Sequence, residues 1–181
     1  MNIFFLNFEN KYTVRDLFDK HLGKQILEIV QMGAAVCYRH TWEPPRKLDG
    51  GHYRPTHANH PMTLWMGDDS ANFAKSISLA LYALTEYRHR FGREHGCALA
   101  VEYLTGWSLR WQDQSPSYGT LPPVCVTPRL KGPPRSFDDV VEAYRQYYID
   151  TKLHLFGYTR REPPIWLTAG MSPADRATLL K

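Results

Sequence analysis

The chain has 181 residues, of which 43% are hydrophobic, and its formal net charge is +4 at pH 7. A chain of this length can bury enough apolar surface to fold without covalent cross-links, and we expect one domain over residues 1–181. Its three cysteines are an odd number with no CxxC spacing, which argues against a disulfide framework and against a common zinc motif.

The N-terminal run MNIFFLNF is short and apolar, and Glu9 and Asn10 end it at once. It is far below the length of a membrane span and lacks a basic leader, so we expect neither a targeting segment nor a membrane partner. The pattern predicts a short, buried β-strand at the N-terminus.

Residues 13–33, TVRDLFDKHLGKQILEIVQMG, are predicted to form the central helix. Thr13 and Asp16 have the spacing of a capping box at its start. Apolar residues recur at helical spacing: Val14, Phe18, Leu22, Ile26 and Ile29. At about 100° per residue, four polar residues share one edge beside the apolar stripe: His21, Lys24, Glu28 and Gln31. This edge is either a catalytic acid–base group or a solvated flank on which Lys24 and Glu28 form an i,i+4 pair.

Residues 41–61 contain several prolines and glycines, which predict a long ordered loop. The loop carries the following polar and aromatic residues: His52, Tyr53, Arg54, His57, Asn59 and His60. Three of its histidines could contribute to a metal site, but no carboxylate or cysteine lies nearby in sequence to complete it. The same groups could bind a phosphate or hold the loop by hydrogen bonds.

The next predicted helix starts at a cap among Asp68, Asp69 and Ser70 and stops at Gly92. One of its sides is polar and carries Asn72, Lys75, Tyr82, Glu86, Arg90 and Arg93. This side is either solvated or suited to a small zwitterion or a phosphate, because arginine presents a planar fork that matches oxyanions.

Residues 97–111 are predicted to form a further helix, and residues 112–134 a long proline-containing connection. Residues 136–156 are predicted to form a helix that begins with a capping pair, Ser136 and Asp139. On that helix Arg145, Tyr148 and Lys152 share one side. Cations interleaved with an aromatic ring suit a DNA backbone and a base, although the cations could also only cover a packed tyrosine. The segment TRREPPIWL, with Arg160 and Arg161, is expected to form a C-terminal clasp, and Ser172-Pro173 starts a last short helix.

Several phrases, taken in order, resemble one family. They are MNIFFL, DKHLGKQILE, RPTHANHP followed by Trp65, Asn72 leading to EYRHRFGREH, EAYRQYYIDTK and PPIW. Together they cover most of the chain and are similar to the phage amino acid:DNA transferases, also described as alpha-glutamyl/putrescinyl thymine pyrophosphorylase-like proteins of thymine hypermodification. The chain departs from the family pattern at Leu22-Gly23 and at Trp65-Met66-Gly67, where the family tends to have a β-branched pair and a WxR arginine. The second departure affects a position where the family arginine would be expected to contact a phosphate or DNA.

The resemblance implies an enzyme that acts on double-stranded DNA. An amine, plausibly that of free glycine, would displace the phosphate of 5-phosphomethyl-deoxyuridine and give a hypermodified thymine. The modified base would be flipped out of the duplex. The resemblance also implies a phage-encoded protein of the host cytoplasm. We expect no cofactor and no metal, and a mainly α fold: a single compact helical domain with a short N-terminal β-strand and long ordered loops.

Site residues follow from the resemblance together with the chemistry of the side chains. The predicted catalytic group is Glu28, His21, Lys24 and His57, which would accept the amine proton and neutralise the leaving phosphate. The predicted substrate-binding residues are His60, Asn72, Glu86, Arg90, Tyr53 and Trp65. The predicted DNA-binding residues are Arg54, Arg145, Tyr148, Lys152, Arg160 and Arg161. A DNA glycosylase or nuclease acting on a flipped base, and a non-catalytic DNA-binding accessory protein, remain alternatives.

Overall fold

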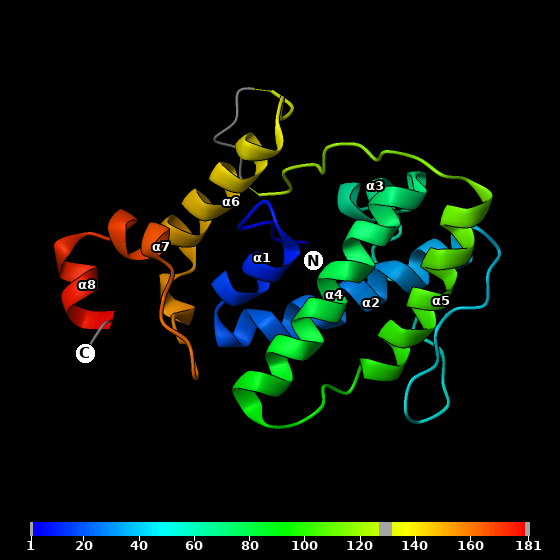
Figure 1. The fold of residues 1–181 in the computed structure, drawn as a ribbon, viewed down its shortest axis with the longest axis horizontal. Helices are drawn as coiled ribbons and strands as arrows, with labels where there is room; N and C mark the ends of the chain where they lie inside the picture. The colour runs from blue at the N-terminus through cyan, green and yellow to red at the C-terminus, as the bar shows by residue number, and fades with distance from the viewer. Residues whose placement is uncertain (1, 127–131, 180–181) are drawn as a thin grey trace.

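Helices account for most of the chain in a computed structural model that describes residues 2–126 and 132–179 (Figure 1). Within those residues the α-helices are α1 (Asn10–Asp16), α2 (Asp19–Arg39), α3 (Pro61–Asp68), α4 (Ser70–Phe91), α5 (Ala98–Gln114), α6 (Phe137–Thr151), α7 (Ile165–Gly170) and α8 (Pro173–Leu179). A short 3₁₀ turn, Leu153–Leu155, follows α6. The predicted mainly helical fold class is therefore confirmed.

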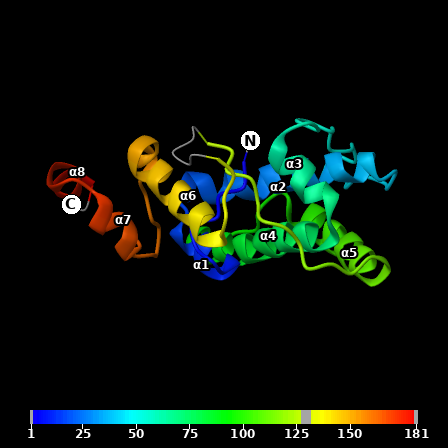
Figure 2. The ribbon, with the colours of Figure 1, turned by 90° about the horizontal axis from the view of Figure 1, so that it is seen from above.

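The core lies between α2, α4 and α5, which pack against one another, while α1 and α3 pack against α2 or α4. Its centre is apolar and fully buried, as at Leu22, Ile29 and Phe73. A Cβ atom at Gly33 would lie 2.7 Å from Cδ1 of Leu104, so this glycine permits the close approach of α2 and α5. Helices α6, α7 and α8 lie to one side of this bundle, and α8 is at the end of the molecule (Figures 1 and 2).

The N-terminal segment corrects one expectation, because residues 2–6 are buried, apart from the partly buried Phe4, but form no strand. Their backbone groups are satisfied by side chains of α2. The Asn2 N–H donates to Oε2 of Glu28 at 2.7 Å and the Phe4 N–H to Oε1 of Gln25 at 3.0 Å, while Gln25 donates back to the Asn2 carbonyl. An extended buried segment needs partners for its backbone polar groups, and here a helix supplies them in place of a neighbouring strand.

The predicted central helix is also corrected, because it is two helices. Leu17 and Phe18 have extended backbone conformations that separate α1 from α2. Thr13 lies inside α1 and not at its cap, and its hydroxyl exchanges hydrogen bonds with the backbone of Asn7. The His21–Glu28 edge lies wholly on α2, so the break leaves its helical geometry intact.

Other helix boundaries agree with the sequence. Asp69 caps α4 by accepting from two backbone N–H groups, and Gly92 ends it in the left-handed conformation with φ of 66°. Ser136 and Asp139 form the predicted capping box of α6. That helix ends at Thr151, earlier than expected, and α7 begins within the predicted C-terminal clasp and extends beyond it to Gly170.

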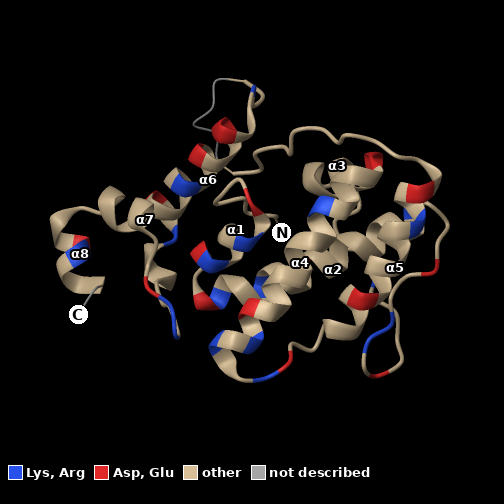
Figure 3. Ribbon diagram, viewed as in Figure 1, with Lys and Arg blue, Asp and Glu red and all other residues tan. Residues whose placement is uncertain are grey.

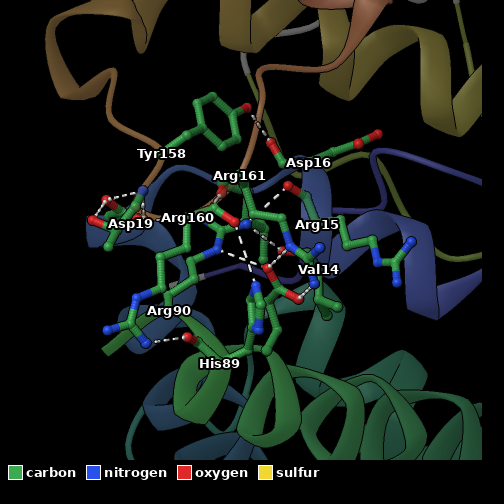
Figure 4. Close-up of polar contacts among 12 residues, drawn as sticks. Val14, Arg15, Asp16, Asp19, His89, Arg90, Tyr158, Arg160 and Arg161 are labelled. Atoms are coloured by element: carbon green, nitrogen blue, oxygen red, sulfur yellow. Dashed lines mark hydrogen bonds and ion pairs between the residues drawn. The ribbon is translucent and has the colours of Figure 1, made fainter. Parts of the chain in front are cut away.

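A buried polar network joins α4 to the α1–α2 junction and to residues 158–161 (Figure 4). Arg90, only 1% exposed, is its centre and donates five hydrogen bonds. The acceptors are the Glu86 and Asp19 carboxylates and the carbonyls of Val14, Arg15 and Leu17. Arg161 forms a bidentate pair with Glu86 from the other side. A guanidinium has five N–H donors, so this network uses all the hydrogen-bonding capacity of Arg90.

Asp16, at the end of α1, gives the fold a testable pH dependence. Burial raises the pKa of its carboxyl from 3.8 to about 6, although Trp166 Nε1 donates a hydrogen bond to it at 2.8 Å. The folded state therefore holds this proton to a higher pH than the unfolded state, and the ionised carboxylate destabilises the fold above about pH 6. This destabilisation is relieved as the pH falls from about 6 toward 4.

We expect Asp16→Asn to be more stable than the wild type at pH 7, by up to roughly 3 kcal/mol for a shift of about two pKa units. The amide oxygen still accepts from Trp166. Urea unfolding at pH 7 and at pH 4.5 should show the gap between the two proteins shrinking at the lower pH. Asp113→Asn, which removes an exposed carboxylate, is the control, and a gap that is the same at both pH values would contradict the assignment.

Candidate functional site

A cavity of about 180 Å³ lies between α2, α6, the N-terminal segment and the connection that follows α5. Polar side chains, including two lysines, a glutamate and a histidine, make up much of its wall. The lining residues are Asn2, Phe4, His21, Lys24, Gln25, Glu28, Cys125, Val126, Tyr147 and Lys152. The N-terminal segment, residues 125–126 and residues 147–152 therefore meet at this cavity around the polar edge of α2.

Three members of the predicted catalytic group meet at this cavity: His21, Lys24 and Glu28. Lys24 Nζ lies 3.7 Å from Oε1 of Glu28, so the i,i+4 pair also exists. The Lys24 side chain is 67% exposed and that of Glu28 is 11% exposed. Glu28 thus faces the cavity from a packed position and also holds the Asn2 N–H, whereas Lys24 lies at the mouth.

His21 is fixed by buried aromatic neighbours. Its Nδ1 lies 2.5 Å from the hydroxyl of Tyr148, and the Phe4 ring stacks on the imidazole at 5.4 Å between centroids. Burial, followed by the charges of Lys152, Lys24 and His154, lowers the pKa of His21 from 6.5 to about 4. His21 is therefore a neutral imidazole at physiological pH and can donate or accept a hydrogen bond at the cavity.

Lys152, predicted as a DNA contact, lies at the C-terminal cap of α6 and lines the same cavity. It joins Lys24 there from an element more than a hundred residues away in sequence. The two ammonium groups and the Glu28 carboxylate leave the cavity with a net positive wall. Such a wall suits a phosphate or a carboxylate group of a small ligand.

The predicted site residues in the loop between α2 and α3 do not line this cavity. His57 is exposed and has a left-handed backbone with φ of 57°. His60 caps α3, where Nδ1 accepts the Met62 N–H at 3.2 Å. Burial lowers the pKa of His60, and the Glu28 charge opposes that shift, which places His60 within electrostatic reach of the cavity.

Tyr53 and Arg54 line a separate groove of about 520 Å³. The Tyr53 hydroxyl is buried and donates to Sγ of Cys97.

Among residues 2–126 and 132–179, no group of three or more His, Cys, Asp or Glu side chains is arranged to hold a metal ion. Metal-independent activity nevertheless stays a prediction.

Three predicted substrate-binding residues have structural roles instead. Arg90 and Glu86 are buried in the network of Figure 4, with their charges paired to each other and to Arg161 or Asp19. Asn72 is 2% exposed; its amide donates to Trp65 O and Thr120 Oγ1 and accepts the Thr120 N–H. These three residues of the polar side of α4 are therefore covered by other parts of the chain and hold the fold together, whereas Tyr82 on the same side is 45% exposed.

Trp65, the next residue of that set, is 6% exposed, and its indole N–H donates to the carbonyl of Thr120. Its ring lines a more apolar pocket of about 560 Å³ with proline residues of the α5–α6 connection. Trp65 is therefore on a different surface from the cavity of His21 and Glu28.

The predicted DNA-binding residues of α6 and of the C-terminal clasp differ in burial and in their contacts. Tyr148 is fully buried against His21, so it is not available to stack on a base. Arg145 donates from Nε to the carbonyl of Leu6 and lies 5.0 Å from the Trp166 ring. Arg160 is exposed and donates to the carbonyl of His89. Figure 3 shows lysine and arginine residues interspersed with acidic ones in this view.

Several cavity residues were absent from the predicted set, notably Phe4, Gln25 and Tyr147. Gln25 was within reach of sequence reasoning, because it lies four residues after His21 and three before Glu28 on one helix. Phe4 and Tyr147 carry no local pattern that assigns them to a site. Their positions depend on how the N-terminal segment and α6 pack on α2.

Comparison of the sequence with protein-family models and with curated proteins, and of the fold with solved structures, finds no match. No helix within the described ranges has an apolar stretch long enough to cross a bilayer.

Proposed function

We propose that this protein is a DNA-modifying transferase that displaces the phosphate of 5-phosphomethyl-deoxyuridine in double-stranded DNA with the amine of an amino acid, glycine being the one expected. The resemblance of its sequence phrases to the phage amino acid:DNA transferases motivates the proposal. The observation that supports it is the cavity in which Glu28, a neutral His21, Lys24 and Lys152 converge. This set combines a proton acceptor with two cations, as amine-for-phosphate exchange requires.

In the proposed reaction the amine nitrogen forms a bond to the exocyclic methylene carbon of the base. The carbon–oxygen bond to the phosphate breaks, and the phosphate leaves with the electron pair. Free glycine is mostly an ammonium ion at neutral pH, so its nitrogen must lose a proton, which Glu28 accepts. Lys24 and Lys152 neutralise the departing phosphate, and His21 orients the amine or the phosphate through a hydrogen bond.

The proposal implies two partners: duplex DNA that carries the phosphorylated base, and a free amino acid. The base must leave the duplex to reach the cavity. A phage-encoded protein working in the host cytoplasm fits this chemistry. No cofactor enters the proposed reaction.

Mass spectrometry of nucleosides tests the reaction directly. The protein is incubated with phosphomethyluracil duplex DNA and glycine, and the DNA is then digested to nucleosides. A nucleoside in which glycine has replaced the phosphate supports the transferase. A lost base would indicate a glycosylase, and unchanged nucleosides a binding protein without catalysis. Strand breaks, seen on a denaturing gel of the DNA before digestion, would indicate a nuclease.

The two cavity lysines should be needed for the phosphate. We expect Lys24→Gln and Lys152→Gln each to lower kcat/KM by roughly 10- to 100-fold, because each removes a charge-assisted hydrogen bond to the leaving group. Lys20→Gln is the matched control, since Lys20 is exposed on the same helix but does not line the cavity. Equal rates for all three variants would contradict the phosphate site.

A further inference from the structure

A tight turn in the loop between α2 and α3 is held by its own backbone. Arg46 and His52 form an antiparallel bridge. Inside it, the Lys47 N–H donates to the Gly51 carbonyl at 2.6 Å, and the Gly50 N–H donates to the Lys47 carbonyl at 3.0 Å. Gly50 has φ of +83°, a conformation that glycine adopts without strain. Residues 46–52 are therefore an ordered hairpin-like turn, which we call the 46–52 turn.

The 46–52 turn exposes the side chain of Leu48 to solvent. The Leu48 side chain is 75% exposed, and Leu27 of α2, across the groove of about 520 Å³, is 37% exposed. A single exposed leucine is ordinary on a protein surface. Leu48 differs in being carried by an ordered turn at the edge of a groove whose wall also includes the Tyr53 side chain.

The charges at this groove suit a polyanion. Lys47 and Arg54 line it, and neither side chain forms an ion pair with any residue that the structure describes. Asp49 is the one carboxylate among the described lining residues, and its Oδ1 accepts the Gly51 N–H. The two unpaired cations therefore give the groove a net positive charge.

The groove also lies next to the proposed catalytic cavity. Leu27 and Gln31 line the groove, whereas Lys24 and Glu28 line the cavity, all from the same stretch of α2. At about 100° and 1.5 Å per residue, the two sets lie at overlapping heights on the helix and about 60° apart around it. A duplex held at the groove would thus bring a flipped base close to the cavity mouth.

We propose that the 46–52 turn is a DNA wedge: Leu48 inserts into the base stack where the target base has left it, while Lys47 and Arg54 contact the flanking phosphates. Apolar side chains are inserted between base steps by proteins that deform DNA, because the wedge offsets part of the lost stacking. The proposal rests on the proposed function only in taking duplex DNA as the partner. It assigns the extrusion of the base to a different element from the one that carries the chemistry.

Fluorescence of 2-aminopurine tests the wedge without requiring turnover. The probe is a duplex with 5-phosphomethyluracil next to 2-aminopurine, whose fluorescence rises when the neighbouring base leaves the stack. Wild-type protein should raise the signal at saturation, and Leu48→Ala should lower the extruded fraction by about tenfold or more, since alanine is too short to offset the lost stacking. Leu109→Ala, which truncates a leucine on α5 that is 59% exposed, is the matched control and should behave as wild type.

A mismatched duplex separates a wedge from a general effect on binding. A guanine opposite the phosphomethyluracil weakens the pair, so less work is left for the wedge, and the Leu48→Ala defect should shrink severalfold. A defect of equal size in both duplexes would overturn the wedge. Lys47→Gln and Arg54→Gln should each reduce the slope of log affinity against log salt by about 1, and Lys11→Gln, on α1, should not.

The outcomes distinguish this inference from the proposed reaction. Loss of extrusion in Leu48→Ala, with no glycine adduct from the wild type, supports the wedge and rejects the transferase. Glycine transfer by the wild type, with Leu48→Ala extruding and reacting equally well, rejects the wedge and keeps the transferase. Wild-type protein that leaves the 2-aminopurine signal unchanged while bound to the duplex rejects the wedge.

Discussion

Glu28→Gln is expected to lower the rate of glycine transfer by about 10²- to 10⁴-fold while leaving the fold nearly unchanged. The amide has the shape of the carboxylate but cannot accept the amine proton. Its oxygen can still accept the Asn2 N–H, which the carboxylate holds at 2.7 Å. Single-turnover transfer to phosphomethyluracil DNA and thermal unfolding of the same preparation measure the two effects separately.

Glu28→Ala is the informative companion, because Glu28 has two roles to separate. Alanine removes the proton acceptor and also the anchor of the N-terminal segment, so Glu28→Ala should lose both turnover and stability. If Glu28 serves only to hold Asn2 and to pair with Lys24, Glu28→Gln should transfer glycine at the wild-type rate. That result would remove Glu28 from the proposed mechanism.

Arg90→Met is expected to destabilise the protein by about 3–5 kcal/mol, the largest loss that we predict for a single substitution. Methionine fills much of the space but leaves three backbone carbonyls and the Asp19 carboxylate without their Arg90 hydrogen bonds. Arg161 remains paired with Glu86. The free energy of unfolding from urea titration measures the loss.

Arg88→Met is the control for this substitution. Arg88 is on the same helix and pairs with Glu94, but its side chain is 68% exposed. An exposed pair contributes about 0–1 kcal/mol, so this variant should unfold close to the wild type. If Arg90→Met does not fold, Arg90→Lys should fold with an intermediate stability, because it restores the charge but not the five-donor fork. Equal stability of the Arg90 and Arg88 methionine variants would show that the buried network contributes little.

The sequence by itself determined the features that depend on a few neighbouring residues. The helical fold class follows from the spacing of apolar residues, and the limits of α4 follow from the Asp69 cap and Gly92. Ser136 and Asp139 likewise define the start of α6. His21 and Glu28 meet at one cavity because seven residues of α-helix return the chain to nearly the same side. Each of these features is encoded within about two helical turns.

Only the tertiary structure decided which polar residues face a cavity and which are buried in hydrogen bonds within the fold. Helical geometry grouped Glu86 with Arg90, but their burial depends on the packing of residues 14–19 and 161 against α4. Tyr148 reaches His21 across 127 positions of the chain. The N-terminal segment is apolar enough for a strand, yet α2 satisfies its backbone through Gln25 and Glu28. Contacts of this kind depend on which surfaces meet when helices pack, and no local pattern of side chains specifies that.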